Sequence, residues 1–107
     1  MEKEQGISII KRLINQVIPY KKEIIFFGSR DRGEYTEESD FDILVIVQRK
    51  NIDRKILIGL QSQIKRLCAK SGLDADIIVR DRSYAEEMKI FPGNIIHSAV
   101  QTGIHIQ

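Results

Sequence analysis

The fold is decided by residues 23–47, which read EIIFFGSRDRGEYTEESDFDILVIV. Its two ends, EIIFF and FDILVIV, are apolar runs with the length of buried strands. The pair Gly28–Ser29 follows the first run, and Asp40 and Asp42 lie where the second begins. Because residues two apart in a strand point to the same face, the two carboxylates are expected to lie side by side. The stretch therefore predicts two strands and a pair of carboxylates at the start of the second.

The paired carboxylates indicate metal chemistry. Two like charges held this close are costly unless a cation lies between them. Carboxylate oxygens suit Mg²⁺, which usually takes one or two carboxylates together with substrate phosphates. The turn at Gly28–Ser29 offers backbone N–H groups and a hydroxyl to phosphate oxygens. Together these residues predict metal-dependent phosphoryl or nucleotidyl transfer.

The whole motif resembles the signature of the minimal nucleotidyltransferases, the smallest members of the DNA polymerase β-like superfamily. That family's pattern is Gly-Ser, ten residues, then Asp-x-Asp, and Gly28–Ser29 with Asp40–Asp42 match it in residue type and spacing. The resemblance implies a third acidic residue on a later strand, and Asp76 in the run LDADIIV fits. Residues 94–104 also resemble the family's last helix and strand, so the resemblance extends over most of the chain.

The resemblance implies a role for each aspartate. Asp40 and Asp42 are expected to hold both metal ions, and Asp76 to complete the site of the ion that activates the attacking hydroxyl. Asp74 shares the strand face of Asp76 and competes for this role. Asp76 is preferred because the apolar run 77–79 follows it directly, as the family pattern implies. A single carboxylate here would be interpreted more simply as a charged strand end in water.

Four residues are expected to bind the nucleotide. Gly28 has no side chain, so the backbone can approach a triphosphate closely. Ser29 is expected to donate its hydroxyl to a phosphate, and it also suits the N-cap of a short helical turn. Arg30 and Arg32 adjoin this cradle, and a planar guanidinium matches phosphate geometry. For the two arginines, an ordinary solvated surface position is an equal alternative.

Length and composition limit the architecture and the location of the protein. The 107 residues, 42% of them hydrophobic, predict one compact domain over residues 1–107 without a separate substrate-binding domain. No apolar run approaches the roughly 18 residues of a membrane span, and the N-terminus does not resemble a signal peptide. A single cysteine excludes an intrachain disulfide and fits a reducing compartment. We therefore predict a cytoplasmic protein without a membrane partner.

The charge balance argues against nucleic acid as a partner. The formal net charge is +2, from 17 basic and 15 acidic residues, which is too even for a nucleic-acid binder. Basic pairs such as Arg54–Lys55 are interleaved with acidic residues and are interpreted as solvated helix faces. Tyr84 and the other tyrosines are too dispersed along the chain to form a stacking platform.

Periodicity predicts alternating helices and strands. Helices are expected at 5–18, 52–70 and 94–101, a short helix is expected to begin at the capping box of Ser83, and strands are expected at 23–27, 41–47, 76–79 and 104–106. The apolar stripe of the second helix is expected to comprise Ile56, Leu60, Ile64, Leu67 and Cys68. Because helices separate the main strands, we predict an α/β fold with a small mixed sheet.

The two faces of the sheet raise the question of what covers the acidic one. The resemblance implies helices packed mainly on one face, with the acidic site on the other. Leu44 and Ile46 share the face of Asp40 and Asp42, so this face is apolar beyond the site. The last helix is expected to roof it, or else it exposes a patch suited to a partner. A homodimer or a heteromeric complex is therefore expected.

The resemblance implies a function and leaves the acceptor open. Stand-alone relatives commonly pair with a small helical HEPN-type protein as toxin and antitoxin, and transfer AMP from ATP, with two Mg²⁺ ions, to a tyrosine of that toxin. The short chain makes transfer to a small molecule a less suitable alternative. The even charge argues in the same way against modification of nucleic-acid ends. A binding-only antitoxin would not need all three aspartates. The expected function is therefore protein adenylylation.

Overall fold

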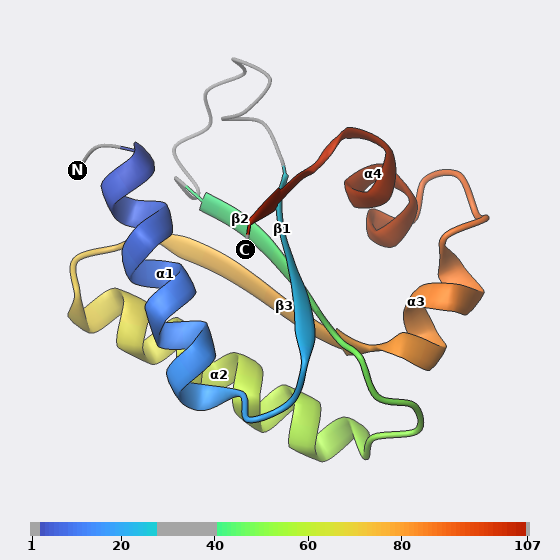
Figure 1. Cartoon of the computed structure of the whole chain (residues 1–107), viewed down its shortest axis with the longest axis horizontal. Helices are drawn as coiled ribbons and strands as arrows, with labels where there is room; N and C mark the ends of the chain where they lie inside the picture. Colours follow the sequence, from blue (N-terminus) through green and yellow to red (C-terminus); the bar gives the residue numbers. More distant parts are fainter. Residues whose placement is uncertain (1–2, 28–40, 107) are drawn as a thin grey trace.

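A computed structural model describes residues 3–27 and 41–106, and in it the predicted α/β fold with a mixed sheet is confirmed (Figure 1). The helices are α1 (Lys3–Val17), α2 (Arg54–Lys70), α3 (Arg82–Met88) and α4 (Ile95–Thr102). The strands are β1 (Lys22–Phe27), β2 (Phe41–Val47), β3 (Ala75–Asp81) and β4 (Ile104–Ile106). The described strands lie in the order β3-β2-β1-β4, with β2 parallel to β3 and the other neighbours antiparallel. None of the described helices has both the length and the apolar character that crossing a membrane requires.

The main core lies between the sheet and the two long helices. Figure 1 shows α1 and α2 on the same side of the sheet. Alternate residues of β2 point into this layer, among them Phe41, whose ring packs edge to face against Phe26 at 6.0 Å between centroids. Gly6 of α1 lies against the Phe41 ring, where the Cβ of any other residue would overlap it. The helix and strand therefore approach each other closely at the start of β2.

The short helices α3 and α4 cover the opposite face of the sheet. Figure 1 shows them on the side away from α1 and α2. Leu44 and Ile46 of β2 pack there against Ala85 of α3 and against Ile96 and Ala99 of α4. The expectation that the last helix covers this face is confirmed, with α3 as a second contributor. Leu44 and Ile46 are therefore buried, at 0% and 4% exposure.

Helix α2 begins two residues later than predicted. Asp53 is its N-cap, accepting a 2.8 Å hydrogen bond from the Lys55 backbone N–H, so Ile52 lies outside the helix. The predicted stripe was wrong at Ile56, whose side chain is 48% exposed, because Leu57 takes the inward position beside Ile64 and Cys68. Burial also raises the pKa of the Cys68 thiol.

Strand β3 extends two residues further than predicted, to Asp81, and this residue begins the next helix. Asp81 Oδ1 accepts a 2.9 Å hydrogen bond from the Tyr84 N–H, which makes Asp81 the N-cap of α3. The prediction that Ser83 starts this helix was therefore wrong; Ser83 lies inside its first turn. Asn94 caps α4 through a 2.8 Å hydrogen bond from the Ile96 N–H, and β4 forms where predicted.

Candidate active site

Two of the predicted aspartates lie side by side at one end of the sheet. In the parallel pairing of β2 with β3, Asp42 is the register partner of Asp76. Their Cα atoms are therefore roughly 5 Å apart, the spacing of neighbouring strands. On its other side, Asp42 pairs with Phe27, the last residue of β1. The register thus brings together residues that are distant in the sequence.

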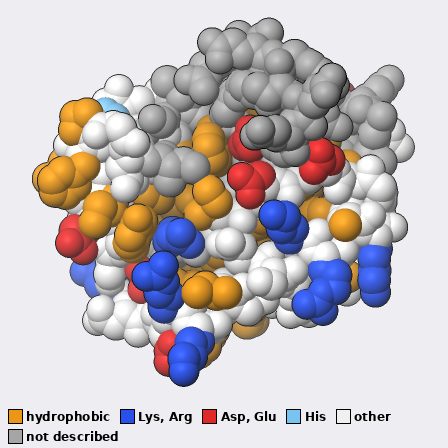
Figure 2. Space-filling model, turned by 180° about the vertical axis from the view of Figure 1, so that it is seen from behind, with side chains coloured by type: hydrophobic (Ala, Val, Ile, Leu, Met, Phe, Trp, Pro, Cys, Tyr) orange, Lys and Arg blue, Asp and Glu red, His pale blue; other side chains and the backbone are white. Residues whose placement is uncertain are grey.

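Both carboxylates are accessible from outside. Asp76 is exposed and Asp42 is half-buried. The side chain of Asp76 forms no hydrogen bond or ion pair with another residue of the described ranges, 3–27 and 41–106. Figure 2 shows acidic side chains gathered at the border of the grey residues. Adjacent like charges of this kind repel each other unless a cation lies between them.

The donor set suits Mg²⁺, the metal that the sequence resemblance implies. Asp42 and Asp76 offer only carboxylate oxygens, the ligand type that Mg²⁺ prefers, and neither oxygen pair is sealed inside the core. The described residues by themselves contain no group of three potential metal ligands. The third predicted ligand, Asp40, lies outside the described residues. The Asp42–Asp76 pair is therefore the described part of a candidate Mg²⁺ site.

The competing carboxylate, Asp74, occupies a different place. It precedes β3, whose first residue is Ala75, and its backbone oxygen accepts a hydrogen bond from the Phe41 N–H at 3.3 Å. Asp74 is exposed, but the register partner of Asp42 is Asp76. The strand pairing therefore places Asp76, and not Asp74, directly beside Asp42.

The predicted nucleotide-binding residues lie outside the described part of the chain. Gly28, Ser29, Arg30 and Arg32 all fall within residues 28–40. The described residues on either side are Phe27 and Phe41, and Phe27 is the register partner of Asp42. The two described residues that flank this segment in the sequence therefore lie at the strand ends beside the carboxylates.

Sequence reasoning missed one charged residue on the face of the carboxylates. Arg80 follows Asp76 by four positions in β3, so the two residues share a face of the sheet. Its guanidinium lies over the Tyr84 ring, 5.4 Å from the centroid, and its Nη1 donates to the Val79 oxygen at 2.9 Å. The alternation of Asp76, Ile78 and Arg80 was the signal that could have identified it.

Comparison with known proteins identifies relatives along most of the chain. Residues 7–96 match the nucleotidyltransferase domain family. A protein of Methanocaldococcus jannaschii is 29% identical over 90 residues, covering 83% of this chain and 86% of that protein. A second protein of the same organism is 68% identical over 67 residues, covering 63% of this chain and 57% of that protein. Both carry the provisional name of protein adenylyltransferase.

Two solved structures have a similar fold. The crystal structure of a provisionally named nucleotidyltransferase from Sulfolobus solfataricus aligns with a TM-score of 0.53 and 27% identity, covering 78% of this chain and 77% of that one. A crystal structure described as a toxin–antitoxin with AMP-PNP aligns with a TM-score of 0.57 and 20% identity, covering 97% of this chain and 72% of that one. At this identity the second likeness concerns the fold alone. With its family match, its mixed sheet and its paired aspartates, the chain belongs to the nucleotidyltransferase domain family and fits the minimal members of that family.

Proposed function

We propose that this protein is an Mg²⁺-dependent adenylyltransferase that moves AMP from ATP to a hydroxyl of a partner protein. The acceptor that the family resemblance favours is a tyrosine of a small helical HEPN-type toxin, which gives this chain the role of antitoxin. The proposal is supported by two M. jannaschii relatives named provisionally as protein adenylyltransferases. The fold is also that of a toxin–antitoxin structure with an ATP analogue, AMP-PNP.

The observation that carries the proposal is the register of β2 and β3. It brings Asp42 and Asp76 together on one face of the sheet, open to the outside and adjacent to the ends of residues 28–40. Mg²⁺, held by these two carboxylates and Asp40, would neutralise the charge of the triphosphate and acidify the attacking hydroxyl when bound. Two like charges side by side repel each other unless a cation lies between them, which supports a metal in this place.

The residues of the chain divide the remaining work. Gly28 and Ser29, with Arg30 and Arg32, bind the phosphate oxygens of ATP and orient the α-phosphorus. We assign Asp76 to the acceptor side, where it would help to hold the metal that acidifies the acceptor hydroxyl and keep the hydroxyl oxygen in line with the bond to the leaving pyrophosphate. The new bond joins the acceptor oxygen to the α-phosphorus, the old bond to pyrophosphate breaks, and the hydroxyl proton passes to solvent. Catalysis here consists of positioning and charge stabilisation.

A protein acceptor fits the names of the two M. jannaschii relatives, both of which are provisionally protein adenylyltransferases. In this proposal the partner that presents the hydroxyl also supplies the rest of the acceptor site. A protein is therefore preferred to a small molecule as the acceptor. A homodimer stays a prediction beside this heteromeric assembly.

The test follows the α-phosphate of ATP. The purified protein is incubated with Mg²⁺, ATP radiolabelled at the α-phosphate and a lysate of the native host, and labelled proteins are separated by size. Wild type is compared with Asp42→Asn and with Asp53→Asn, a matched loss of charge at a helix cap that asparagine can also fill. We expect label on one small protein with wild type and Asp53→Asn, and none with Asp42→Asn.

The alternatives give different patterns. Equal labelling by wild type and Asp42→Asn would contradict the role of the carboxylates. Stable binding of a partner by both proteins, with no label on any protein, would replace transfer with a binding-only antitoxin. Label that migrates with a small molecule or with nucleic acid would keep the chemistry and change the acceptor class.

A further inference from the structure

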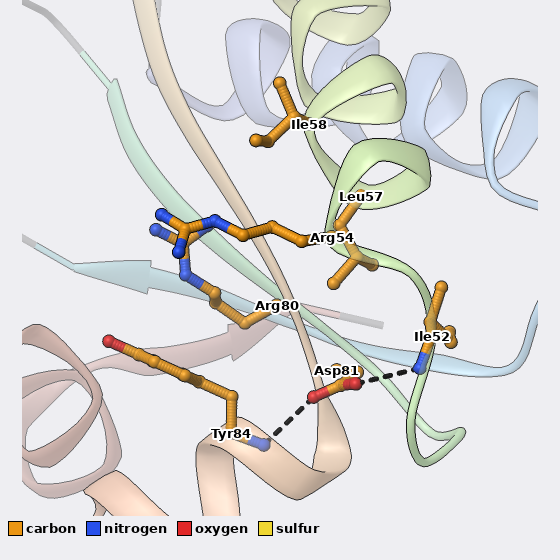
Figure 3. Close-up of a pocket in the computed structure, with 7 residues that line it drawn as sticks. All are labelled: Ile52, Arg54, Leu57, Ile58, Arg80, Asp81 and Tyr84. Carbon is orange, nitrogen blue, oxygen red and sulfur yellow. Dashed lines mark hydrogen bonds between the residues drawn. The ribbon is translucent and has the colours of Figure 1, made fainter.

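A pocket lies at the outer edge of β3, between α2 and α3 (Figure 3). Its volume is about 260 Å³, and it is lined by Ile52, Arg54, Leu57, Ile58, Arg80, Asp81 and Tyr84. Figure 3 shows the side chains of Arg54 and Arg80 extending toward the same end of the pocket, with Ile58 above them and Tyr84 below. The pocket therefore combines apolar walls with two guanidinium groups.

The charges of this pocket are not balanced from within. Asp81 is 6% exposed, and its two oxygens accept hydrogen bonds from the backbone N–H groups of Ile52, at 3.1 Å, and Tyr84, at 2.9 Å. In the described part of the chain, neither Arg54 nor Arg80 forms an ion pair. The one carboxylate is thus used by the backbone, and two cations remain for a ligand from outside.

Arg80 is held ready for such a ligand. Its Nη1 donates to the Val79 oxygen at 2.9 Å and makes a longer contact, 3.4 Å, with Gln61 Oε1, while its guanidinium lies over the Tyr84 ring. A planar guanidinium fixed on one side keeps N–H donors on the other for a carboxylate. Fixing it in advance lowers the entropy that binding must remove.

The size of the pocket favours a side chain over a whole nucleotide. Pockets for small molecules usually measure about 300–1,000 Å³, and this one, at about 260 Å³, is smaller. Ile58 is 47% exposed at its rim, so an accessible apolar wall lies beside the two guanidinium groups. An acidic side chain matches both features, because its methylene groups contact the wall and its carboxylate meets the guanidinium groups.

We propose that this pocket docks an acidic side chain of the acceptor protein, beside the site of transfer. The proposal rests on the proposed function. Arg80 and Asp76 lie on the same face of β3, four residues apart. Along the strand this separates their Cα atoms by roughly 13 Å. An extended acceptor segment covers that distance in about four residues. The docked Asp or Glu therefore lies about four residues from the hydroxyl that receives AMP.

A binding experiment tests the pocket without catalysis. The full chain, labelled with ¹⁵N, is titrated with the end-blocked peptide Glu-Ala-Ala-Ala-Tyr, with the same peptide carrying Gln for Glu, and with inorganic phosphate. The side-chain Nε–Hε signals of Arg54 and Arg80 report occupancy. The variant Arg54→Gln/Arg80→Gln is compared with Arg12→Gln/Arg66→Gln, which removes the same charge from exposed positions outside the pocket.

We expect the acidic peptide to shift both arginine signals. Loss of the peptide carboxylate, or of the two pocket arginines, should weaken binding roughly tenfold or more, and the Arg12→Gln/Arg66→Gln protein should bind as wild type does. Equal binding of the Gln peptide would overturn the proposal. So would saturation of the same signals by phosphate at lower concentrations than by the peptide, because the site would then be one for phosphate.

A transfer experiment separates this inference from the proposed function. With the acceptor identified by labelling, Arg54→Gln/Arg80→Gln should raise the KM for the acceptor roughly tenfold and leave the KM for ATP unchanged. An unchanged acceptor KM would contradict the docking role and leave adenylylation intact. If wild type labels no protein, the proposed function fails, and the peptide titration still decides whether the pocket binds a carboxylate.

Discussion

Asp76 and Asp81 lie in the same strand, on opposite faces of the sheet, and their surroundings differ in every respect. Asp81 is buried, and both its oxygens accept backbone hydrogen bonds that join the start of α3 to the loop before α2. Asp76 is exposed beside Asp42. Its side chain has no hydrogen-bond or ion-pair partner within residues 3–27 and 41–106. One carboxylate is satisfied by the fold, and the other is left available to a ligand.

The difference separates structural from functional acidic residues. A buried carboxylate is tolerated only when its oxygens are satisfied, so removal of Asp81 should lower stability. Asp76 is exposed and lies beside the like charge of Asp42, so it should add nothing to stability. Stability and transfer activity are therefore expected to respond to different residues, although these residues are close in sequence.

The largest expected effect on stability concerns Phe41, the neighbour of Asp42 on the opposite face. Its ring is 1% exposed and packs against Phe26, so Phe41→Ala should lower the free energy of unfolding by about 3–5 kcal/mol. Urea denaturation measures this, with Ile56→Ala, at a half-exposed position, as the control. A loss below about 1 kcal/mol would show that the α1 and α2 face is not the main core.

The next largest effect on stability is expected at Asp81, the buried carboxylate that contrasts with Asp76. Asp81→Ala leaves two backbone N–H groups without their acceptor, and it should lower the free energy of unfolding by about 2–3 kcal/mol. Asp53→Ala, which removes an exposed helix cap, should cost only about 1 kcal/mol. Thermal and urea unfolding of both variants decide this; an equal cost would contradict the structural role assigned to the buried carboxylate.

A smaller effect is expected from two helical glycines. An added Cβ at Gly6 overlaps the buried Phe41 ring, whereas one at Gly59 meets nothing within 4 Å. Gly6→Ala should therefore destabilise by about 1 kcal/mol even after the gain in helix propensity, and Gly59→Ala should stabilise by up to about 1 kcal/mol. Stabilisation by both substitutions, measured by urea denaturation, would show that α1 does not approach β2 so closely.

The smallest expected change in stability is at Asp76. Asp76→Asn removes a repulsion with Asp42 and no described hydrogen bond, so the free energy of unfolding should stay within about 0.5 kcal/mol or rise slightly. The measurement is urea denaturation without added metal. A clear loss of stability would mean that Asp76, like Asp81, serves the fold.

Much of the fold could be predicted from local pattern. The bounds of β2 are as expected because the short apolar run at 43–47 is rich in β-branched residues, which is typical of a buried strand. The boundaries that were wrong depend on contacts between distant residues. Asp81 ends β3 and caps α3 partly because Ile52, 29 positions earlier, donates to it. The local sequence makes Ser83 an equally good N-cap. It does not reveal the hydrogen bond from Ile52 to Asp81.

The candidate site shows the same division. The sequence identified Asp42 and Asp76 as candidates, but their placement side by side depends on the parallel register of two strands separated by α2. Arg80 was overlooked because a charged residue near a strand end is usually solvated. Its role depends on Tyr84 and Arg54, which only the packing of α2 and α3 brings to it.

We propose that Asp42 and Asp76 act together in nucleotidyl transfer, and two neighbouring aspartates of β3 and its approach allow a direct test. Transfer of label from the α-phosphate of ATP to the acceptor in the native host's lysate is compared for wild type, Asp76→Asn and Asp74→Asn, which remove the same charge two residues apart. We expect Asp76→Asn to lose on the order of 10²–10³-fold in rate or more, and Asp74→Asn to stay close to wild type. Activity retained by Asp76→Asn, or lost equally in both variants, would contradict the assignment.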